Sequence, residues 1–285
     1  MKVKGFMGRT HAILSILLLE ICLLIPLDFF QTTFWQLKED VLLCIVGLCI
    51  LVGGALLPDL DNHVSKAGAT LGFIGSIFTI FMQSTSSIVY SIYHGKRDMP
   101  PLSQHRYLWH TLLVAVGFIC LFYFGMPTGN FTISTNITNS IQTGQFLYFL
   151  RTNAVLVLFL LLSFVATLTG SSMILTSIQK IYPLPKMVKY IFPSLVLIYV
   201  FTTNYTNLRI LSLCMSFGYL FHLLEDFFAD SGIPALFPIP IGKKVWKRFS
   251  FPITVTTGGT VNTMIDYIGI CFVFLLFFIL LAKPA

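Results

Sequence analysis

The chain has 285 residues, of which 56% are hydrophobic and only 10% charged, whereas an ordinary soluble domain has about 25% charged residues. This composition and the mean hydropathy of +0.85 exclude a soluble globular domain and indicate an integral membrane protein. The apolar runs have helix length and lack the alternation of barrel strands, so we expect an all-α, polytopic membrane helix bundle. The net charge of +7 is explained by orientation in the membrane, and no nucleic-acid partner is expected.

The apolar runs predict about seven transmembrane helices and one further segment. That segment, residues 66–95, is rich in Gly, Ser and Thr and is expected to be re-entrant or interfacial. Residues 128–144 are predicted to form a polar outer loop. The long run 141–178 is predicted to be one helix with a kink near Gly170. The predicted spans are residues 11–27, 41–57, 105–126, 141–178, 188–201, 208–228 and 264–281.

Positive charge predicts the orientation, because Lys and Arg are concentrated on the cytoplasmic side of membrane proteins. With a cytoplasmic N-terminus, and with residues 66–95 returning to the side they came from, 14 of the 18 basic residues lie inside. We therefore expect a multi-pass protein of the cell membrane, with residues 1–285 as one integral membrane domain. Residues 231–262 contain four prolines and are expected to form an inner-face loop. Its basic cluster, which is expected to anchor the loop to the inner leaflet, is Lys243, Lys244, Lys247 and Arg248.

Two carboxylates appear abruptly in residues 57–62 (LPDLDN), where the uncharged apolar run 41–57 ends. Pro58 suits that break, because its ring disfavours helix for the preceding residue. A carboxylate at the edge of a bilayer is costly unless it is wet, paired or bound to a metal. Asp59 and Asp61 can turn their oxygens toward one hard cation or a close pair of cations. A solvated turn is the alternative interpretation, because Asp and Asn are common in turns.

Further ionisable residues fall on the same side of the membrane in this topology. His222 and Asp226 are i,i+4 and share a helix face, so they can bind one ion, or Asp226 can orient the imidazole. His105 and His110 are i,i+5 and converge only if His105 precedes the first helical turn. A single histidine is usually packed or solvated, but four histidines and three acids at one depth predict a metal site. The candidate ligands are His11, Asp59, Asp61, His105, His110, His222 and Asp226.

The residue types also indicate a chemistry. His and Asp ligands together favour zinc, with manganese or magnesium as alternatives. Asp59 or Asp61 could bridge two ions or take the proton of a bound water. Arg106 and His110 are i,i+4 and would share a helix face. An arginine beside a cation site suits an anionic substrate, because the guanidinium matches phosphate oxygens. Asp59, Asp61 and Arg106 are therefore the candidate catalytic residues.

Four blocks of the sequence carry a resemblance to a known family: Thr10-His11, residues 57–61 (LPDLD), 105–111 (HRYLWHT) and 218–226 (GYLFHLLED). In order and spacing they resemble the TH or GH start and the LLPDxD, HRGxTHS and GYLxHLxxD blocks of the YdjM-like family of membrane-bound, metal-dependent hydrolases. Residues 232–238 (GIPALFP) also resemble its GVPLLWP segment. The resemblance implies a metal-dependent hydrolase embedded in the membrane.

The chain departs from the family pattern at two places. Tyr107 and Trp109 stand where the family has Gly and Thr, which implies a bulkier pocket wall. Asn262 stands where the family often has Glu; an asparagine can coordinate through its carbonyl oxygen but cannot act as a base. The ligand order is also loosely similar to that of zinc-dependent phospholipase C and related zinc nucleases, which favours phosphoester hydrolysis over amide or peptide hydrolysis.

We therefore expect a hydrolase at the cytoplasmic membrane face, acting on a membrane lipid or lipid-linked phosphoester. A transporter or channel is one alternative, because buried ionisable residues also mark ion paths. Such a path needs polar residues across the bilayer, whereas the outer halves of the spans are largely apolar except for Glu20, Thr167 and Thr169. A non-catalytic protein with a closed, structural metal site is the other alternative. The oligomeric state stays open.

Overall fold

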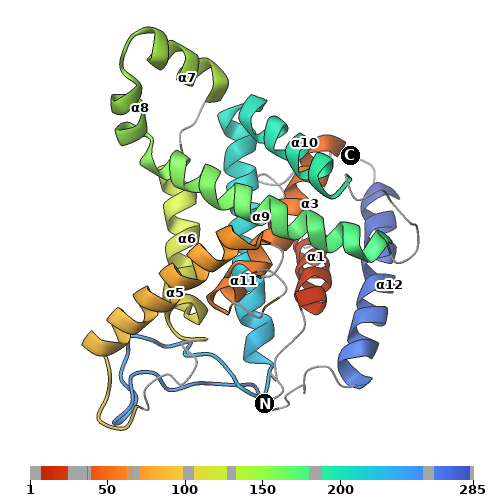
Figure 1. The fold of residues 1–285 in the computed structure, drawn as a ribbon. Coiled ribbons are helices and arrows are strands. Elements are labelled where there is room, and N and C mark those ends of the chain that lie inside the picture. The colour runs from red at the N-terminus through yellow and green to blue at the C-terminus, as the bar shows by residue number, and fades with distance from the viewer. Residues whose placement is uncertain are drawn as a thin grey trace.

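A computed structural model describes residues 8–24, 37, 40–62, 65, 68, 71–98, 106–126, 133–179, 188–252 and 260–282 of the chain. Over these residues the fold is helical, and the expected all-α class is confirmed (Figure 1). The elements in chain order are α1 (Gly8–Leu24), α3 (Val41–Leu56), η1 (Pro58–Asp61), α5 (Phe73–Ile92), η2 (Leu108–His110), α6 (Leu112–Gly125), α7 (Ile133–Gln142), α8 (Phe146–Thr152), α9 (Ala154–Gln179), α10 (Val188–Thr202), α11 (Tyr205–Phe227) and α12 (Thr260–Ala282).

Four helical segments of the described chain are long and apolar enough to cross a membrane: Val41–Asp61, Phe73–Ile92, Ala154–Met173 and Tyr205–Phe227. Shorter apolar helices cover Leu112–Gly125, Pro193–Thr202 and Thr263–Leu276. These helices coincide with six of the seven predicted spans and with the extra segment. A polytopic bundle is therefore supported, whereas the count of seven crossings stays a prediction.

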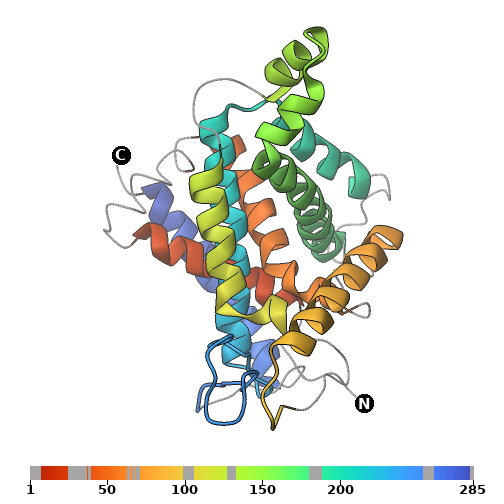
Figure 2. The same cartoon turned by 90° about the vertical axis from the view of Figure 1, so that its left-hand side faces the viewer.

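Two parts of the chain differ from the expected helices. The run 141–178 is not one helix, because Gly144, with a φ of 68°, and Asn153 interrupt it and leave α7, α8 and α9 as separate elements. The expected outer loop thus contains a helix, α7. Residues 73–92 form one continuous helix, α5, which excludes a re-entrant hairpin. Figures 1 and 2 show α5 lying obliquely to α6 and α11.

The centre of the bundle is α3, which packs between α9 and α11 (Figure 2). A Cβ atom added at Gly54 or Gly218 would lie 2.3 Å or 2.1 Å from a carbonyl oxygen of the facing helix. Gly53 and Gly170 allow the same close approach between α3 and α9. Small residues let membrane helices pack backbone to backbone. The glycines therefore bring the C-terminal part of α3 to a short, fixed separation from the middle of α11.

The chain between α11 and α12 is irregular over the described residues 228–252, with isolated bridges between Ile233 and Phe249 and between Ile241 and Lys244. The predicted loop at 231–262 is therefore present up to 252, but α12 already begins at Thr260. Figures 1 and 2 show this loop at the same end of the bundle as the C-terminal end of α5.

The glycine contact predicts a position-specific effect on stability. Gly218→Ala is expected to destabilise the protein by about 1–3 kcal/mol, because the new Cβ overlaps the α3 backbone. Gly117→Ala in α6 is the matched control, since a Cβ there meets nothing within 4 Å. Thermal unfolding of the two purified variants in detergent measures the difference. Equal unfolding temperatures for both variants would contradict the close helix contact.

Candidate metal centre

Ends of four segments bring most of the predicted ligands into one buried cluster. His11 comes from the first turn of α1, and His222 and Asp226 come from the last turns of α11. Asp59 and Asp61 lie on η1, and His110 ends η2. His105 lies outside the described residues. The structure thus brings together side chains that are far apart in the sequence: His11 and Asp226 are 215 residues apart.

Three donor atoms at the centre have the spacing of a metal site. His110 Nε2 and His222 Nε2 lie 3.3 Å apart, and each lies 3.4 Å from Asp226 Oδ2. A tetrahedral zinc ion with bonds of about 2.0–2.1 Å separates its ligand atoms by about 3.4 Å. Asp226 Oδ2 is buried and receives no hydrogen bond from the described residues. The triangle of donors therefore fits a zinc-sized ion.

A second group of donors adjoins the first and shares His222. His11, Asp59 and His222 each offer an atom within 4.8 Å of the others. The His11 ring stacks on the His222 ring with centroids 4.0 Å apart, and Asp59 Oδ1 lies 3.9 Å from His222 Nε2. His222 Nε2 lies close to donors of both groups but can bind only one ion. The two groups therefore form one cluster of five residues around His222.

Each of two imidazole rings, those of His11 and His110, has a carboxyl group on the side away from the other donors. Glu225 Oε2 lies 2.5 Å from His11 Nδ1, and Asp61 Oδ2 lies 3.5 Å from His110 Nδ1. Metal-bound histidines in proteins have such a partner on the nitrogen that does not face the metal. The geometry thus gives Asp61, a predicted ligand, the position of an orienting residue. Glu225 belongs to the same sequence block as Asp226 but was not among the predicted ligands.

Arg106 reaches the cluster through an unusual backbone turn. Its Nη2 donates to Asp226 Oδ1 at 2.7 Å, its Nη1 donates to the Ser231 hydroxyl, and its backbone N–H donates to Asp61 Oδ2 at 3.0 Å. Its φ of 60° is rare for a residue with a side chain. The expected helical i,i+4 pair with His110 is absent from this stretch, because α6 begins only at Leu112.

The short 3₁₀ helices η1 and η2, which carry part of the site, are held in place by hydrogen bonds with α5. Thr79 donates to the Leu60 carbonyl at 2.6 Å, and Gln83 donates to the Asp61 carbonyl at 2.8 Å. The Trp109 indole donates to the Met82 carbonyl at 3.0 Å. Trp109, which the sequence suggested as a pocket wall, therefore anchors η2 to α5. Tyr219 adds a further contact, because its hydroxyl donates to the Trp109 carbonyl.

Charge in the cluster favours a cation. Four carboxyl groups, of Asp59, Asp61, Glu225 and Asp226, are gathered around one guanidinium, that of Arg106. Buried negative charge is costly unless a cation compensates it. Next to Arg106, burial raises the pKa of the Tyr107 phenol above its usual value, so this ring adds no charge at neutral pH.

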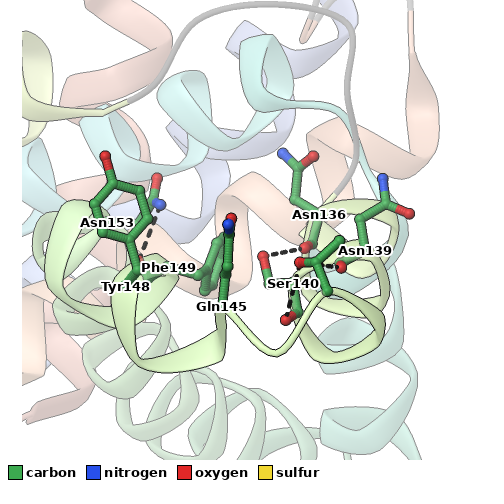
Figure 3. A pocket seen from close by; sticks show the side chains of 8 residues that line it. Asn136, Asn139, Ser140, Gln145, Tyr148, Phe149 and Asn153 are labelled. Atoms are coloured by element: carbon green, nitrogen blue, oxygen red, sulfur yellow. Dashed lines mark hydrogen bonds between the residues drawn. The ribbon is translucent and has the colours of Figure 1, made fainter.

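Access to the cluster is from the Asp59 side. The Asp59 side chain is 17% exposed, whereas those of His110, His222 and Asp226 are 0% exposed. A cavity of about 370 Å³ lies elsewhere, on α7 and α8 at the far end of the bundle (Figures 1 and 3). Amide and hydroxyl groups together with Tyr148 and Phe149 line it, so it offers no carboxylate or imidazole among its described residues.

One carboxylate near the cluster was missed by the sequence reasoning. Asp266 of α12 accepts a hydrogen bond from the Thr10 hydroxyl at 2.7 Å and lies 3.8 Å from Arg9 Nε. Asn262, the position where the family often has Glu, lies one helical turn earlier in α12, and its side chain lies outside the described part. The i,i+4 spacing from Asn262 is the signal that could have identified Asp266.

Comparison with known proteins identifies a family and nothing more specific. No curated protein and no solved structure matches the chain. The YdjM inner membrane protein family matches residues 6–284, nearly the whole chain. This match confirms the resemblance carried by the four sequence blocks. Together with the apolar helices, it shows that the chain belongs to the YdjM inner membrane protein family and is a multi-pass protein of that membrane.

Proposed function

We propose that this protein is a metal-dependent hydrolase that acts on a lipid-linked phosphoester at the cytoplasmic face of the membrane, with its N-terminus in the cytoplasm. The observation that carries the proposal is the triangle of His110 Nε2, His222 Nε2 and Asp226 Oδ2, with sides of 3.3, 3.4 and 3.4 Å. These atoms are the donors that zinc prefers, at the separation that zinc requires. Manganese and magnesium are the alternative ions.

Residues around the triangle orient the donor side chains toward the position of the metal. Glu225 Oε2 lies 2.5 Å from His11 Nδ1; in the tautomer with the proton on Nδ1, Glu225 accepts it and His11 Nε2 offers its lone pair to a metal. Asp61 Oδ2 lies behind the His110 ring, 3.5 Å from Nδ1, and is placed to orient that ring when a metal is bound. Arg106 orients Asp226 through Oδ1 and leaves Oδ2 to bind a cation. A phosphate contact by Arg106 would use N–H groups other than those bound to Asp226 and Ser231.

The hydrolytic step needs a base at the accessible edge of the site. A bound divalent metal would lower the pKa of a coordinated water and polarise the scissile phosphoryl group. Asp59 is the partly exposed carboxylate of the cluster and lies 3.9 Å from His222 Nε2. We assign it the proton of that water. The position of the cluster at helix ends of a membrane bundle supports a lipid-linked substrate, which would reach it laterally.

A structural metal site is the second candidate. The complete burial of His110, His222 and Asp226 favours it, because structural zinc sites are closed. The exposure of Asp59 favours catalysis instead, because it gives water a way to the cluster. A transporter is less well supported, since the polar cluster is confined to one end of α1, α3 and α11.

Removal of a donor is expected to remove the metal. His110→Ala and Asp226→Ala should each lose most of the metal measured by elemental analysis of purified protein, while gel filtration shows folded protein. His94→Ala is the control, because His94 is exposed and belongs to neither donor group. Metal contents equal to that of the unchanged protein in both variants would refute the metal centre.

The orienting role of Glu225 has its own signature. Glu225→Gln is expected to weaken zinc binding by about 10–100-fold, because a partner behind a metal-bound histidine contributes that much affinity. Competition with a chromophoric chelator measures the change. Glu20→Gln is the matched control, since Glu20 is also buried in the bundle but lies nine residues beyond His11 along α1. Equal affinities of the two variants would remove Glu225 from the site.

Catalysis distinguishes the two candidate functions. Asp59→Asn is expected to lower metal-dependent hydrolysis of lipid phosphates by about 10²–10⁴-fold, because an amide cannot accept the water's proton. The assay uses purified protein and a panel of lipid phosphates with and without chelator. Asp230→Asn, at an exposed acid beyond α11, is the control. Hydrolysis restricted to water-soluble substrates would defeat the lipid assignment, and metal-loaded protein without hydrolysis would favour the structural site.

A further inference from the structure

Six exposed cationic side chains lie on two neighbouring segments at the end of the bundle where α5 and α11 finish. One segment, residues 95–98, follows α5, and the other, residues 241–248, belongs to the loop after α11. Figures 1 and 2 show both segments together at that end. We call this surface the basic clamp; its cations are Lys96, Arg97, Lys243, Lys244, Lys247 and Arg248.

A single acid ties the two segments together. Asp98 Oδ2 accepts from the backbone N–H groups of Gly95 at 2.7 Å and Val245 at 2.9 Å. Its other oxygen lies 3.3 Å from the N–H of Trp246. Notably, these bonds go to backbone amides, so the carboxylate organises the cations without pairing with their side chains.

The backbone of the clamp is held rigidly beneath the cations. The N–H of Arg97 donates to the Lys243 carbonyl at 3.1 Å. The Trp246 indole donates to the Tyr93 carbonyl at 2.6 Å and stacks on Phe237 with ring centroids 4.0 Å apart. Trp246 is buried, with 6% of its surface exposed. The positions of the charges are therefore set by the fold before any partner binds.

Apolar side chains are exposed beside these cations. Ile92 and Tyr93 are 65% and 56% exposed at the end of α5, and Ile239 is 61% exposed in the loop. Cations next to exposed apolar groups are typical of surfaces that lie in the headgroup region of a bilayer. A soluble anionic partner would not need these apolar groups. Exposed cations next to exposed apolar side chains thus favour a leaflet of anionic lipids as the partner.

We propose that the basic clamp is a preformed docking surface for the headgroups of anionic phospholipids and that Asp98 is its organising residue. The clamp adjoins the metal centre, because Arg248 Cζ lies 5.3 Å from the centre of the Tyr107 ring and Tyr107 follows Arg106 in the chain. Docked anionic lipid therefore lies near the metal centre. The inference does not depend on catalysis and holds for either candidate function of the metal site.

The test measures binding of a fluorescent short-chain phosphatidylglycerol to the full chain in neutral detergent, by anisotropy, with phosphatidylcholine as the neutral comparison. A triple variant, Lys243→Gln, Lys244→Gln and Lys247→Gln, is expected to bind phosphatidylglycerol about 100-fold more weakly, because each surface cation contributes about fivefold. Arg151→Gln on α8 is the control and should bind like the unchanged protein, since Arg151 is exposed at the far end.

The Asp98→Asn variant distinguishes two explanations of lipid binding: a preformed surface and attraction by net charge alone. This variant becomes more positive, so a surface that acts only through its charge would bind the anionic lipid more tightly. The clamp instead predicts weaker binding, because the two segments lose their common acceptor. Metal content and unfolding temperature are measured in the same samples to show that the site and the fold are intact. The proposal is overturned by tighter binding in Asp98→Asn, by unchanged binding in the triple variant, or by full displacement of the lipid by millimolar inorganic phosphate.

Discussion

The close contact of α3 with α11 is the constraint on which the rest of the structure depends. Gly54 and Gly218 let the two backbones touch, and no side chain can hold them apart at that point. Asp59 follows Gly54 by five residues, and His222 follows Gly218 by one turn. Because the contact lies within five residues of Asp59 and of His222, it determines the distance between the η1 carboxylates and the α11 ligands. A larger residue at either glycine would separate the two halves of the site.

The cluster that results from this contact gathers more buried carboxyl groups than its one arginine can neutralise. Four carboxyl groups are gathered against one arginine in a region closed to water at every donor except Asp59. Neutral imidazoles do not offset this charge, whereas a divalent cation offsets most of it. Binding of such an ion to the folded protein stabilises that state relative to the unfolded chain. A metal bound at the proposed site would therefore contribute to folding whether or not it also catalysed a reaction.

The same end of the molecule carries a second arrangement of charge with the opposite sign. The basic clamp carries its cations on two segments of backbone that are joined by Asp98 and by the hydrogen bond of the Trp246 indole to Tyr93. Arg106, Tyr107 and Arg248 connect this surface to the acidic cluster. In the two proposals, the clamp would attract a negatively charged lipid headgroup and the cluster a divalent cation. The proposed hydrolase would thus have its substrate and its metal at the same end of the bundle.

The sequence by itself determined the membrane class, the helical fold and the residue types of the site. Ionisable residues are so costly in apolar helices that their presence there indicates a functional site. The i,i+4 spacing of His222 and Asp226 already places both side chains on one helix face. The helix positions also follow locally from apolar run length, although the breaks at Gly144 and Asn153 inside a long apolar run were missed.

Only the tertiary structure decided which group faces which. Asp61 lies behind His110, Glu225 lies behind His11, and Arg106 reaches Asp226 instead of sharing a helix face with His110. The sequence left open whether residues 66–95 are re-entrant or interfacial, and the continuous α5 excludes the re-entrant hairpin; the role of Asp98 was invisible in the sequence. The physical reason is that these contacts depend on the approach of helices far apart in sequence and on the positive φ of Arg106. Local patterns of residues encode neither of these features.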